Sequence, residues 1–156
     1  MIRVLMVCTG NICRSPTAEG VLRHLVEERG LADRIEVDSG GMIAYHVGES
    51  PDSRATRMAL ARDIDIREQR ARQVTRDDFA SFDYLLAMDN SHLHDMQAMA
   101  PPEARDKVKL FLSFLDESGA EEVPDPYYGG ASGFDNVFDL IERGSAALLD
   151  HLEAEG

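Results

Sequence analysis

Apolar residues occur in two kinds of pattern along the chain, and the two kinds alternate. Short runs rich in branched and aromatic side chains predict four strands, at residues 2–7, 35–38, 84–88 and 108–112. Longer stretches in which apolar residues recur every three or four positions predict four helices, at residues 17–29, 53–62, 91–99 and 134–152. A shorter helix is expected at residues 75–80, where Thr75 precedes two aspartates in the first turn.

This alternation predicts an α/β fold. We expect a doubly wound, four-stranded parallel sheet with helices on both faces, joined by right-handed connections. The length of 156 residues suits one domain, and the sequence contains no internal repeat or low-complexity segment. A single domain over residues 1–156 is therefore expected. In such folds ligands bind beyond the carboxyl ends of the strands.

The composition indicates which binding partners and which cellular compartment suit the protein. A formal net charge of −13 disfavours nucleic acid and anionic membranes, both of which attract basic surfaces. No apolar run is long enough to span a bilayer, and nothing before the first strand is typical of a signal peptide. Two cysteines fit a reducing compartment better than a disulfide scaffold. We expect a cytoplasmic protein that is a monomer or a weak homo-oligomer.

The segment between the first strand and the first helix, residues 8–15, carries the candidate chemistry. Its sequence is C-T-G-N-I-C-R-S, and it is followed by Pro16, a residue favoured in the first turn of a helix. Backbone N–H groups at a helix N-terminus bind anions, and a cysteine beside them ionises more readily. The guanidinium group of Arg14 can bind two oxygens of a tetrahedral anion. A nucleophile and an anion site are thus predicted within one segment, called here the anion-binding loop.

A purely structural role for Cys8 is the main alternative. Cysteines that end buried strands are usually small core residues. However, the glycine, asparagine, arginine and serine that follow Cys8 are the residues that a tight anion-binding turn requires. The loop also lacks the patterns of the Walker and Rossmann nucleotide-binding loops. A phosphate-like anion is therefore favoured over a nucleotide.

Two segments resemble the low-molecular-weight protein tyrosine phosphatases. They are C-T-G-N-I-C-R-S-P-T-A-E at residues 8–19 and D-P-Y-Y at residues 125–128. Further segments follow in family order, including Y-H-V-G at residues 45–48 and A-R-Q at residues 71–73, so the resemblance covers nearly the whole chain. It implies hydrolysis of phosphotyrosine proteins or aryl phosphates through a phosphocysteine intermediate, without a metal ion or another cofactor.

The resemblance also implies a role for each candidate site residue. Cys8 is the nucleophile, Arg14 binds the phosphate, and Asp125 protonates the leaving group. Ser15 supports the sulfur of Cys8, and Ser39 forms a hydrogen bond to Asn11. The other phosphate-binding residues are Thr9, Gly10, Asn11, Ile12 and Cys13, and the rim that receives the phenyl ring consists of Tyr45, Tyr127 and Tyr128.

Cys13 and Gln69 raise two further points under this resemblance. Family members use the cysteine equivalent to Cys13 to protect the nucleophile as a reversible disulfide, so a redox-sensitive enzyme is expected. Gln69 stands where relatives commonly have a histidine that supports the hydrogen bonds of the loop. This departure affects the expected ionisation of the thiol and the pH profile, but it removes no group that performs the chemistry.

Three other functions are compatible with parts of the pattern. Relatives that hydrolyse protein phosphoarginine have a threonine where this chain has Ile12, and the apolar Ile12 favours the aromatic ester. Arsenate reduction needs a relay of further cysteines, whereas this chain has two cysteines in total. A module that binds phosphorylated partners without turnover would not need both Cys8 and Asp125.

Polar residues near residues 91–99 admit simpler interpretations. Asp89 could be a ligand group, but it is also well placed to cap the helix that follows. His92 and His94 are two positions apart and therefore lie on different faces of that helix. A metal site is not expected there.

Overall fold

The computed structural model describes residues 1–115, 122–124, 126 and 133–155, and its centre is a parallel sheet. The described strands are β1 (Ile2–Cys8), β2 (Ile35–Gly41), β3 (Tyr84–Ala87) and β4 (Val108–Leu110). They form one four-stranded sheet in the order β2-β1-β3-β4, and every pair is parallel. The parallel sheet predicted from the alternation of the elements is confirmed.

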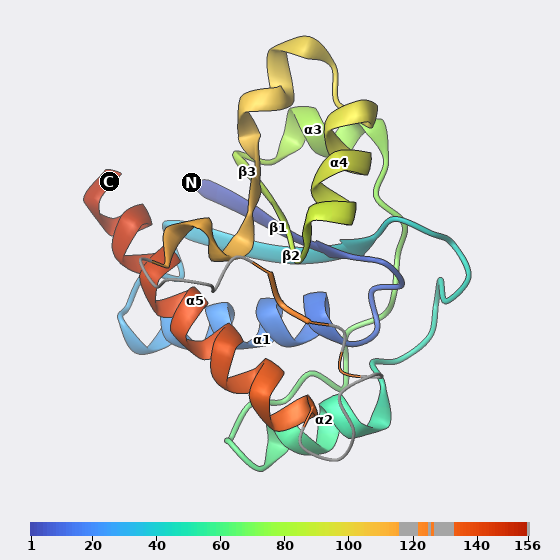
Figure 1. Cartoon of the computed structure of the whole chain (residues 1–156). Coiled ribbons are helices and arrows are strands. Elements are labelled where there is room, and N and C mark those ends of the chain that lie inside the picture. The colour runs from blue at the N-terminus through green and yellow to red at the C-terminus, as the bar shows by residue number, and fades with distance from the viewer. Residues whose placement is uncertain (116–121, 125, 127–132, 156) are drawn as a thin grey trace.

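Helices cover both faces of this sheet. The described α-helices are α1 (Arg14–Glu28), α2 (Ser53–Leu60), α3 (Arg76–Ser81), α4 (Asn90–Met99) and α5 (Gly133–Glu155). Figure 1 shows α1, α2 and α5 on one face and α3 and α4 on the other. Side chains of β1 alternate accordingly, because Val4 and Met6 pack with the first group and Leu5 and Val7 with the second. The doubly wound arrangement is therefore confirmed as well.

Several element boundaries differ from the sequence prediction. β2 continues through Ser39 to Gly41, because Gly41 pairs with Cys8 and its N–H donates to the carbonyl of Arg72. β4 ends at Leu110 and is followed by a 3₁₀ turn at Phe111–Phe114. A second 3₁₀ turn at Pro102–Lys107 was not predicted. Helix α1 begins at Arg14, so Pro16 lies inside its first turn, where a missing N–H costs nothing.

The strand order places the anion-binding loop at a reversal of winding. β1 lies between β2 and β3, and the chain leaves β1 through α1 on one face and enters β3 after α3 on the other. At such a point the loops diverge and leave a crevice beyond the carboxyl ends of the strands. Cys8 is the last residue of β1 and therefore opens into that crevice. In the described part of the chain, no helix is long and apolar enough to cross a membrane.

Candidate active site

The backbone of the anion-binding loop is held by the end of β2. The carbonyl of Cys8 accepts a hydrogen bond from the N–H of Met42 at 3.0 Å, and the carbonyl of Thr9 accepts one from Ile43 at 3.1 Å. Gly41 lies so close that a Cβ atom there would be 2.9 Å from the Thr9 carbonyl oxygen. A side chain at residue 41 would thus displace the loop, and glycine is required by this close approach.

Asn11 is the conformational centre of the loop. Its φ of 59° lies in the left-handed region, as expected for an asparagine in a tight turn. The amide Nδ2 donates to Ser15 Oγ and to Ser39 Oγ, both at 2.9 Å, and Oδ1 accepts from the N–H of Arg72 at 3.0 Å. Because this side chain is buried and bonded on both sides, it fixes the turn. The predicted contact between Asn11 and Ser39 is present.

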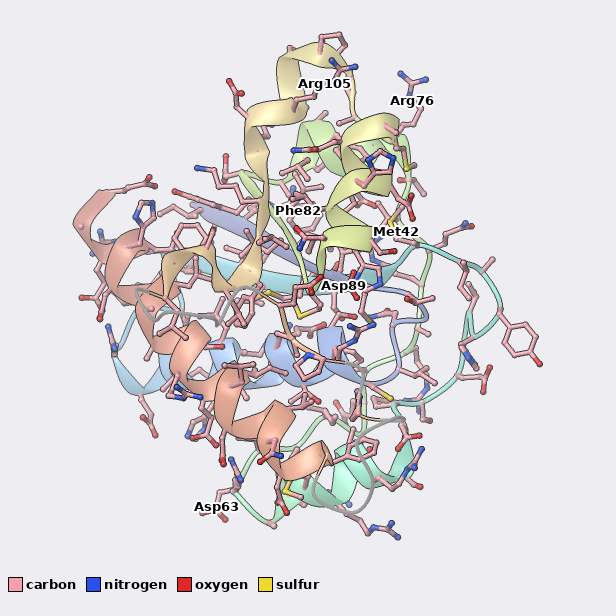
Figure 2. The ribbon with its side chains drawn as sticks, in the orientation of Figure 1. Met42, Asp63, Arg76, Phe82, Asp89 and Arg105 are labelled. Atoms are coloured by element: carbon pink, nitrogen blue, oxygen red, sulfur yellow. The ribbon has the colours of Figure 1, made fainter. Side chains whose placement is uncertain are left out.

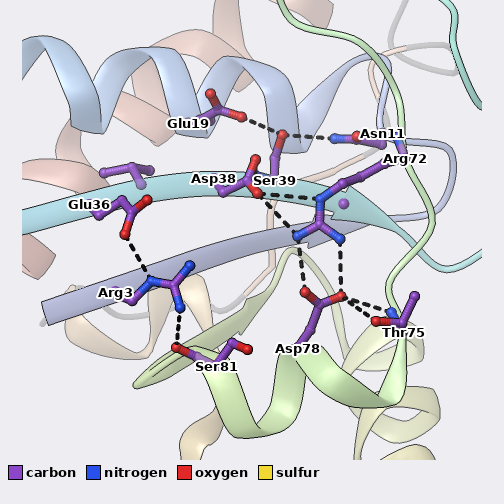
Figure 3. Close-up of polar contacts among 12 residues, drawn as sticks. Arg3, Asn11, Glu19, Glu36, Asp38, Ser39, Arg72, Thr75, Asp78 and Ser81 are labelled. Atoms are coloured by element: carbon purple, nitrogen blue, oxygen red, sulfur yellow. Dashed lines mark hydrogen bonds and ion pairs between the residues drawn. The ribbon is translucent and has the colours of Figure 1, made fainter.

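Two charged side chains, Glu19 and Arg23, extend this network into α1. Ser39 donates from Oγ to Glu19 at 2.6 Å (Figure 3). Glu19 also forms an ion pair with Arg23 at 2.7 Å. Burial raises the pKa of Glu19 above its ordinary value, although Ser39 and Arg23 act in the opposite direction. These contacts fix the hydroxyl that Asn11 requires.

The guanidinium of Arg72 lies between Asp38 and Asp78, at 3.1 and 3.0 Å. Asp78 also accepts a hydrogen bond from the N–H of Thr75 at the start of α3. Arg72 is thereby anchored to both β2 and α3, which fixes the backbone N–H that it donates to Asn11.

The sulfur of Cys8 is buried and lies close to a hydroxyl group. Cys8 Sγ lies 3.0 Å from Ser15 Oγ. Since the Ser15 oxygen accepts from Asn11, its own proton points to the sulfur at 3.0 Å or to the carbonyl of Gly40 at 3.5 Å. The shorter contact lets the hydroxyl donate to a Cys8 thiolate. This geometry stabilises negative charge on the sulfur.

Arg14 is buried and fixed by two acceptors. Its Nη1 donates to Asp89 Oδ2 and to the carbonyl of Val123, each at 2.9 Å. The other oxygen of Asp89 accepts from the N–H of His92 at 3.0 Å and so caps α4. Asp89 lies between α4 and the start of α1 in Figure 2, and it joins the two elements. The sequence left capping and a ligand role as alternatives; capping is observed, together with an ion pair that was not foreseen.

The charge on Asp89 is stabilised by these contacts. Burial alone would raise the pKa of this carboxyl, but the His92 N–H and the Arg14 guanidinium outweigh it. The pKa of Asp89 therefore lies below its ordinary value. Arg14 thus faces an ionised partner at neutral pH.

A pocket of about 210 Å³ opens above the sulfur. It is lined by Cys8, Thr9, Gly10, Ile12, Cys13, Arg14, Ile43 and His46. A wider groove of about 650 Å³, between α1 and α5, has no cysteine, serine or threonine among its lining residues. Of these two, the smaller pocket is the one that combines a buried cysteine, Cys8, with a buried arginine, Arg14.

The described structure brings together most of the sequence-predicted site. Cys8 to Ser15 and Ser39 form one connected cluster. Tyr45 does not line the pocket; its side chain is 82% exposed and meets the edge of His46, with ring centroids 4.8 Å apart. Asp125, Tyr127 and Tyr128 lie outside the described residues.

Four contributors to the site were not assigned from sequence, namely Ile43, His46, Asp89 and His92. Ile43 and His46 lie in the loop at residues 42–52, which follows β2, and the apolar residues of this loop are the sequence signal that could have identified them. No local pattern marks Asp89 or His92 as partners of the loop. Gln69 donates to the carbonyl of Pro16 at 3.1 Å, so it supports the start of α1 and has no hydrogen bond to Asn11 among the described contacts.

Comparison with known proteins agrees with this geometry. The family model described as low molecular weight phosphotyrosine protein phosphatase matches residues 3–156. The chain belongs to this family. The low molecular weight protein-tyrosine-phosphatase YfkJ of Bacillus subtilis is 37% identical over 155 residues, which cover 99% of this chain and 98% of YfkJ.

Solved structures are similar over the same length. A protein tyrosine phosphatase from Entamoeba histolytica, with Hepes in its active site, superposes with a TM-score of 0.94 at 35% identity and covers 99% of both chains. A Drosophila protein described as an arginine phosphatase superposes with a TM-score of 0.89 at 32% identity, covering 97% of this chain and 98% of its own. The structural similarity thus extends over the whole fold. The similar structures include one described as a tyrosine phosphatase and one described as an arginine phosphatase.

Proposed function

We propose that the protein removes phosphate from protein phosphotyrosine through a phosphocysteine intermediate. The observation that carries this proposal is the position of Cys8 Sγ at the floor of a pocket, 3.0 Å from the Ser15 hydroxyl and beside Arg14. In the first step the Cys8 thiolate attacks phosphorus. The S–P bond forms as the P–O bond to the phenolate oxygen breaks.

The anion is held by N–H groups and one guanidinium. Backbone N–H groups of residues 9–14 and the side chain of Arg14 are proposed to bind the three non-bridging oxygens. Arg14 is held in place by Asp89 and Val123, and the turn at Asn11 is fixed by its hydrogen bonds. Preorganised donors of this kind cost no reorganisation during the reaction. These donors act at short range, so they can bind an anion although the net charge of −13 repels it.

Asp125 is proposed as the acid and base of the two steps. It protonates the leaving phenolate oxygen in the first step and accepts a proton from the attacking water in the second. Water then forms a new P–O bond as the S–P bond breaks, which releases inorganic phosphate and restores the thiolate. This role rests on the sequence, where Pro124 and Pro126 flank Asp125 and restrict its backbone.

The pocket mouth supports an aromatic substrate. Ile12, Ile43 and His46 line it among the described residues, and they present apolar and aromatic surface to a phenyl ring. Tyr45, Tyr127 and Tyr128 are proposed to complete the rim. Phosphotyrosine proteins and aryl phosphates are therefore the expected substrates, and the reaction as written needs no metal ion.

Protein phosphoarginine is the second candidate substrate. It is favoured by the similarity to the Drosophila arginine phosphatase. Ile12 lines the pocket of this chain and offers no hydrogen-bonding group to a guanidinium nitrogen. Phosphotyrosine therefore remains the preferred substrate.

Cys13 is proposed to protect the nucleophile against oxidation. Both cysteines are reduced and buried in the structure. A peroxide would oxidise the Cys8 thiolate to a sulfenic acid; attack by the Cys13 thiol would then form an S–S bond and release water. Thiol reduction would restore activity. Cys13→Ser should therefore lose activity irreversibly under peroxide, while the unsubstituted enzyme recovers with dithiothreitol.

The proposal also covers the domain organisation, the location and the oligomeric state of the protein. We infer a single domain over residues 1–156, a cytoplasmic location, and a monomer or a weak homo-oligomer. One cooperative unfolding transition would agree with a single domain, and a monomeric mass at low concentration would agree with a monomer or a weak homo-oligomer. Two separated transitions or a stable higher oligomer would count against them.

The deciding experiment compares two substrates. Phosphate release is measured from a phosphotyrosine peptide and from a phosphoarginine protein, with the Cys8→Ser variant as the blank. Rapid release from the peptide, little from the phosphoarginine protein and none with Cys8→Ser are expected. Preference for phosphoarginine would overturn the substrate assignment, and hydrolysis by Cys8→Ser would overturn the nucleophile.

A further inference from the structure

A buried histidine contacts the anion-binding loop from the far face of the sheet. His92 lies in the first turn of α4, and its Nε2 is 2.7 Å from Thr9 Oγ1. Among the described residues, no group of three potential ligands suits a metal ion. The ring of His92 joins α4 to the first residue after the nucleophile.

The same histidine lies beside the partner of Arg14. His92 Nδ1 is 3.2 Å from Asp89 Oδ1, while Asp89 Oδ2 accepts from Arg14 at 2.9 Å. The first turn of α4 therefore contacts the loop at both ends, through Thr9 near its start and through Arg14 near its end. A shift of this turn would move both phosphate-binding groups together.

We propose that His92 is a positioning residue for phosphate binding, acting through the hydroxyl of Thr9. The proposal rests on the phosphate-binding role proposed above for the loop. The carbonyl of Thr9 is held by the N–H of Ile43, and the side chain is held by His92. With both fixed, the backbone of Thr9 keeps one orientation, and this would hold its N–H in place for the phosphate binding proposed above. Without His92, the solvent-exposed threonine would sample several rotamers.

Two substitutions at residue 92 separate positioning from packing. His92→Leu fills the site but cannot bond to Thr9, and we expect kcat/KM on an aryl phosphate to fall roughly tenfold. His92→Gln carries an amide that can reach the hydroxyl, and it should recover most of that loss. His94→Leu, on the exposed side of the same helix, is the matched control and should leave kcat/KM unchanged.

A variant at the other end of the contact tests the same bond. Thr9→Val keeps the shape of the side chain, removes the hydroxyl and leaves α4 untouched. It should lower kcat/KM about as much as His92→Leu does, and the double variant should lose little more than either single one. Losses that multiply independently would overturn the proposal, as would a harmless Thr9→Val.

Binding of inorganic phosphate supplies a readout that does not depend on turnover. In a Cys8→Ser background, titration calorimetry should show that His92→Leu and Thr9→Val each weaken phosphate binding roughly tenfold. If His92→Leu lowers only the melting temperature, with phosphate affinity and kcat/KM unchanged, the histidine is merely structural and the proposal is wrong. If the unsubstituted enzyme hydrolyses no phosphotyrosine, the proposed function fails, but phosphate affinity still decides the role of His92.

Discussion

Arg14 and Asp89 form an ion pair at 2.9 Å in which the arginine is only 5% exposed. A buried guanidinium with an ionised partner is held in a single orientation, and Arg14 also lines the pocket above Cys8. Asp89 also caps α4, so the ion pair fixes Arg14 relative to β3 and α4. The proposed phosphate binding therefore depends on the carboxylate of Asp89, which acts through Arg14 and does not itself contact the phosphate.

Removing the Asp89 carboxylate should weaken catalysis through Arg14. For Asp89→Ala we expect kcat/KM to fall roughly tenfold to a hundredfold, because a misdirected guanidinium binds the transition state poorly. Asp89→Asn keeps an acceptor and a good helix cap, so its loss should be smaller. Steady-state kinetics on an aryl phosphate measure both. Equal kinetics for Asp89→Ala and the unsubstituted enzyme would contradict this role.

The same ion pair should make stability depend on pH. The pKa of Asp89 is lowered from an ordinary value of 3.8, so its ionisation stabilises the fold above that pH and the stabilisation is lost as pH falls through the lowered pKa. Asp89→Asn should therefore be destabilising in urea unfolding at pH 7 and less so near pH 3. If the free energies of unfolding of Asp89→Asn and the unsubstituted protein differ by the same amount at every pH, this linkage is excluded.

Asn11 combines an unusual backbone conformation with three hydrogen bonds. Asn11→Ala should lower the free energy of unfolding by about 1–3 kcal/mol, since alanine is strained at positive φ and cannot bond to Ser15 or Ser39. Asn11→Gly removes the bonds without the strain. Comparing the two by urea unfolding separates these effects, and identical losses would show that strain contributes little.

Gly41 tests the close approach of β2 to the loop. Gly41→Ala should reduce kcat/KM roughly tenfold or more, because its Cβ would lie 2.9 Å from the Thr9 carbonyl oxygen. Gly30→Ala is the control. Residue 30 has φ of 69°, and a Cβ atom added there would meet no neighbouring atom within 4 Å. Backbone strain should therefore lower the stability of this variant without changing its kcat/KM. Full activity in Gly41→Ala would mean that the loop tolerates displacement.

Asp125 is tested by the basicity of the leaving group. Asp125→Asn should slow esters of weakly acidic phenols most, since these need protonation as the P–O bond breaks. Esters of acidic phenols should be affected least. A plot of log kcat/KM against leaving-group acidity measures this, and an equal loss across the series would argue against general acid catalysis.

The loop was predictable because its parts are contiguous in sequence. Cys8, Asn11 and Arg14 lie within one turn between a strand and a helix, and the periodicity of the flanking segments placed that turn at the carboxyl end of a buried strand. The parallel sheet followed from the same alternation. Local sequence therefore carried the fold class and the position of the candidate nucleophile, Cys8.

Contacts between distant segments were not predictable in this way. Asp89 and His92 reach the loop only because β3 pairs with β1, which brings the start of α4 beside Thr9 and Arg14. The family resemblance implied Tyr45 at the rim, whereas no sequence pattern identified Ile43 and His46, which line the described pocket. The direction of a side chain in an irregular loop is set by tertiary packing, and neither propensity nor periodicity encodes it.

Cys8 is proposed to carry the phosphoryl group during turnover. Rapid acid quenching during hydrolysis of an aryl phosphate, followed by mass spectrometry of the peptide that contains residues 8–14, measures this directly. We expect phosphate on Cys8 in the unsubstituted enzyme and none in Cys8→Ser. Steady turnover with an unmodified Cys8, in an enzyme whose phenol release shows no initial burst, would contradict it.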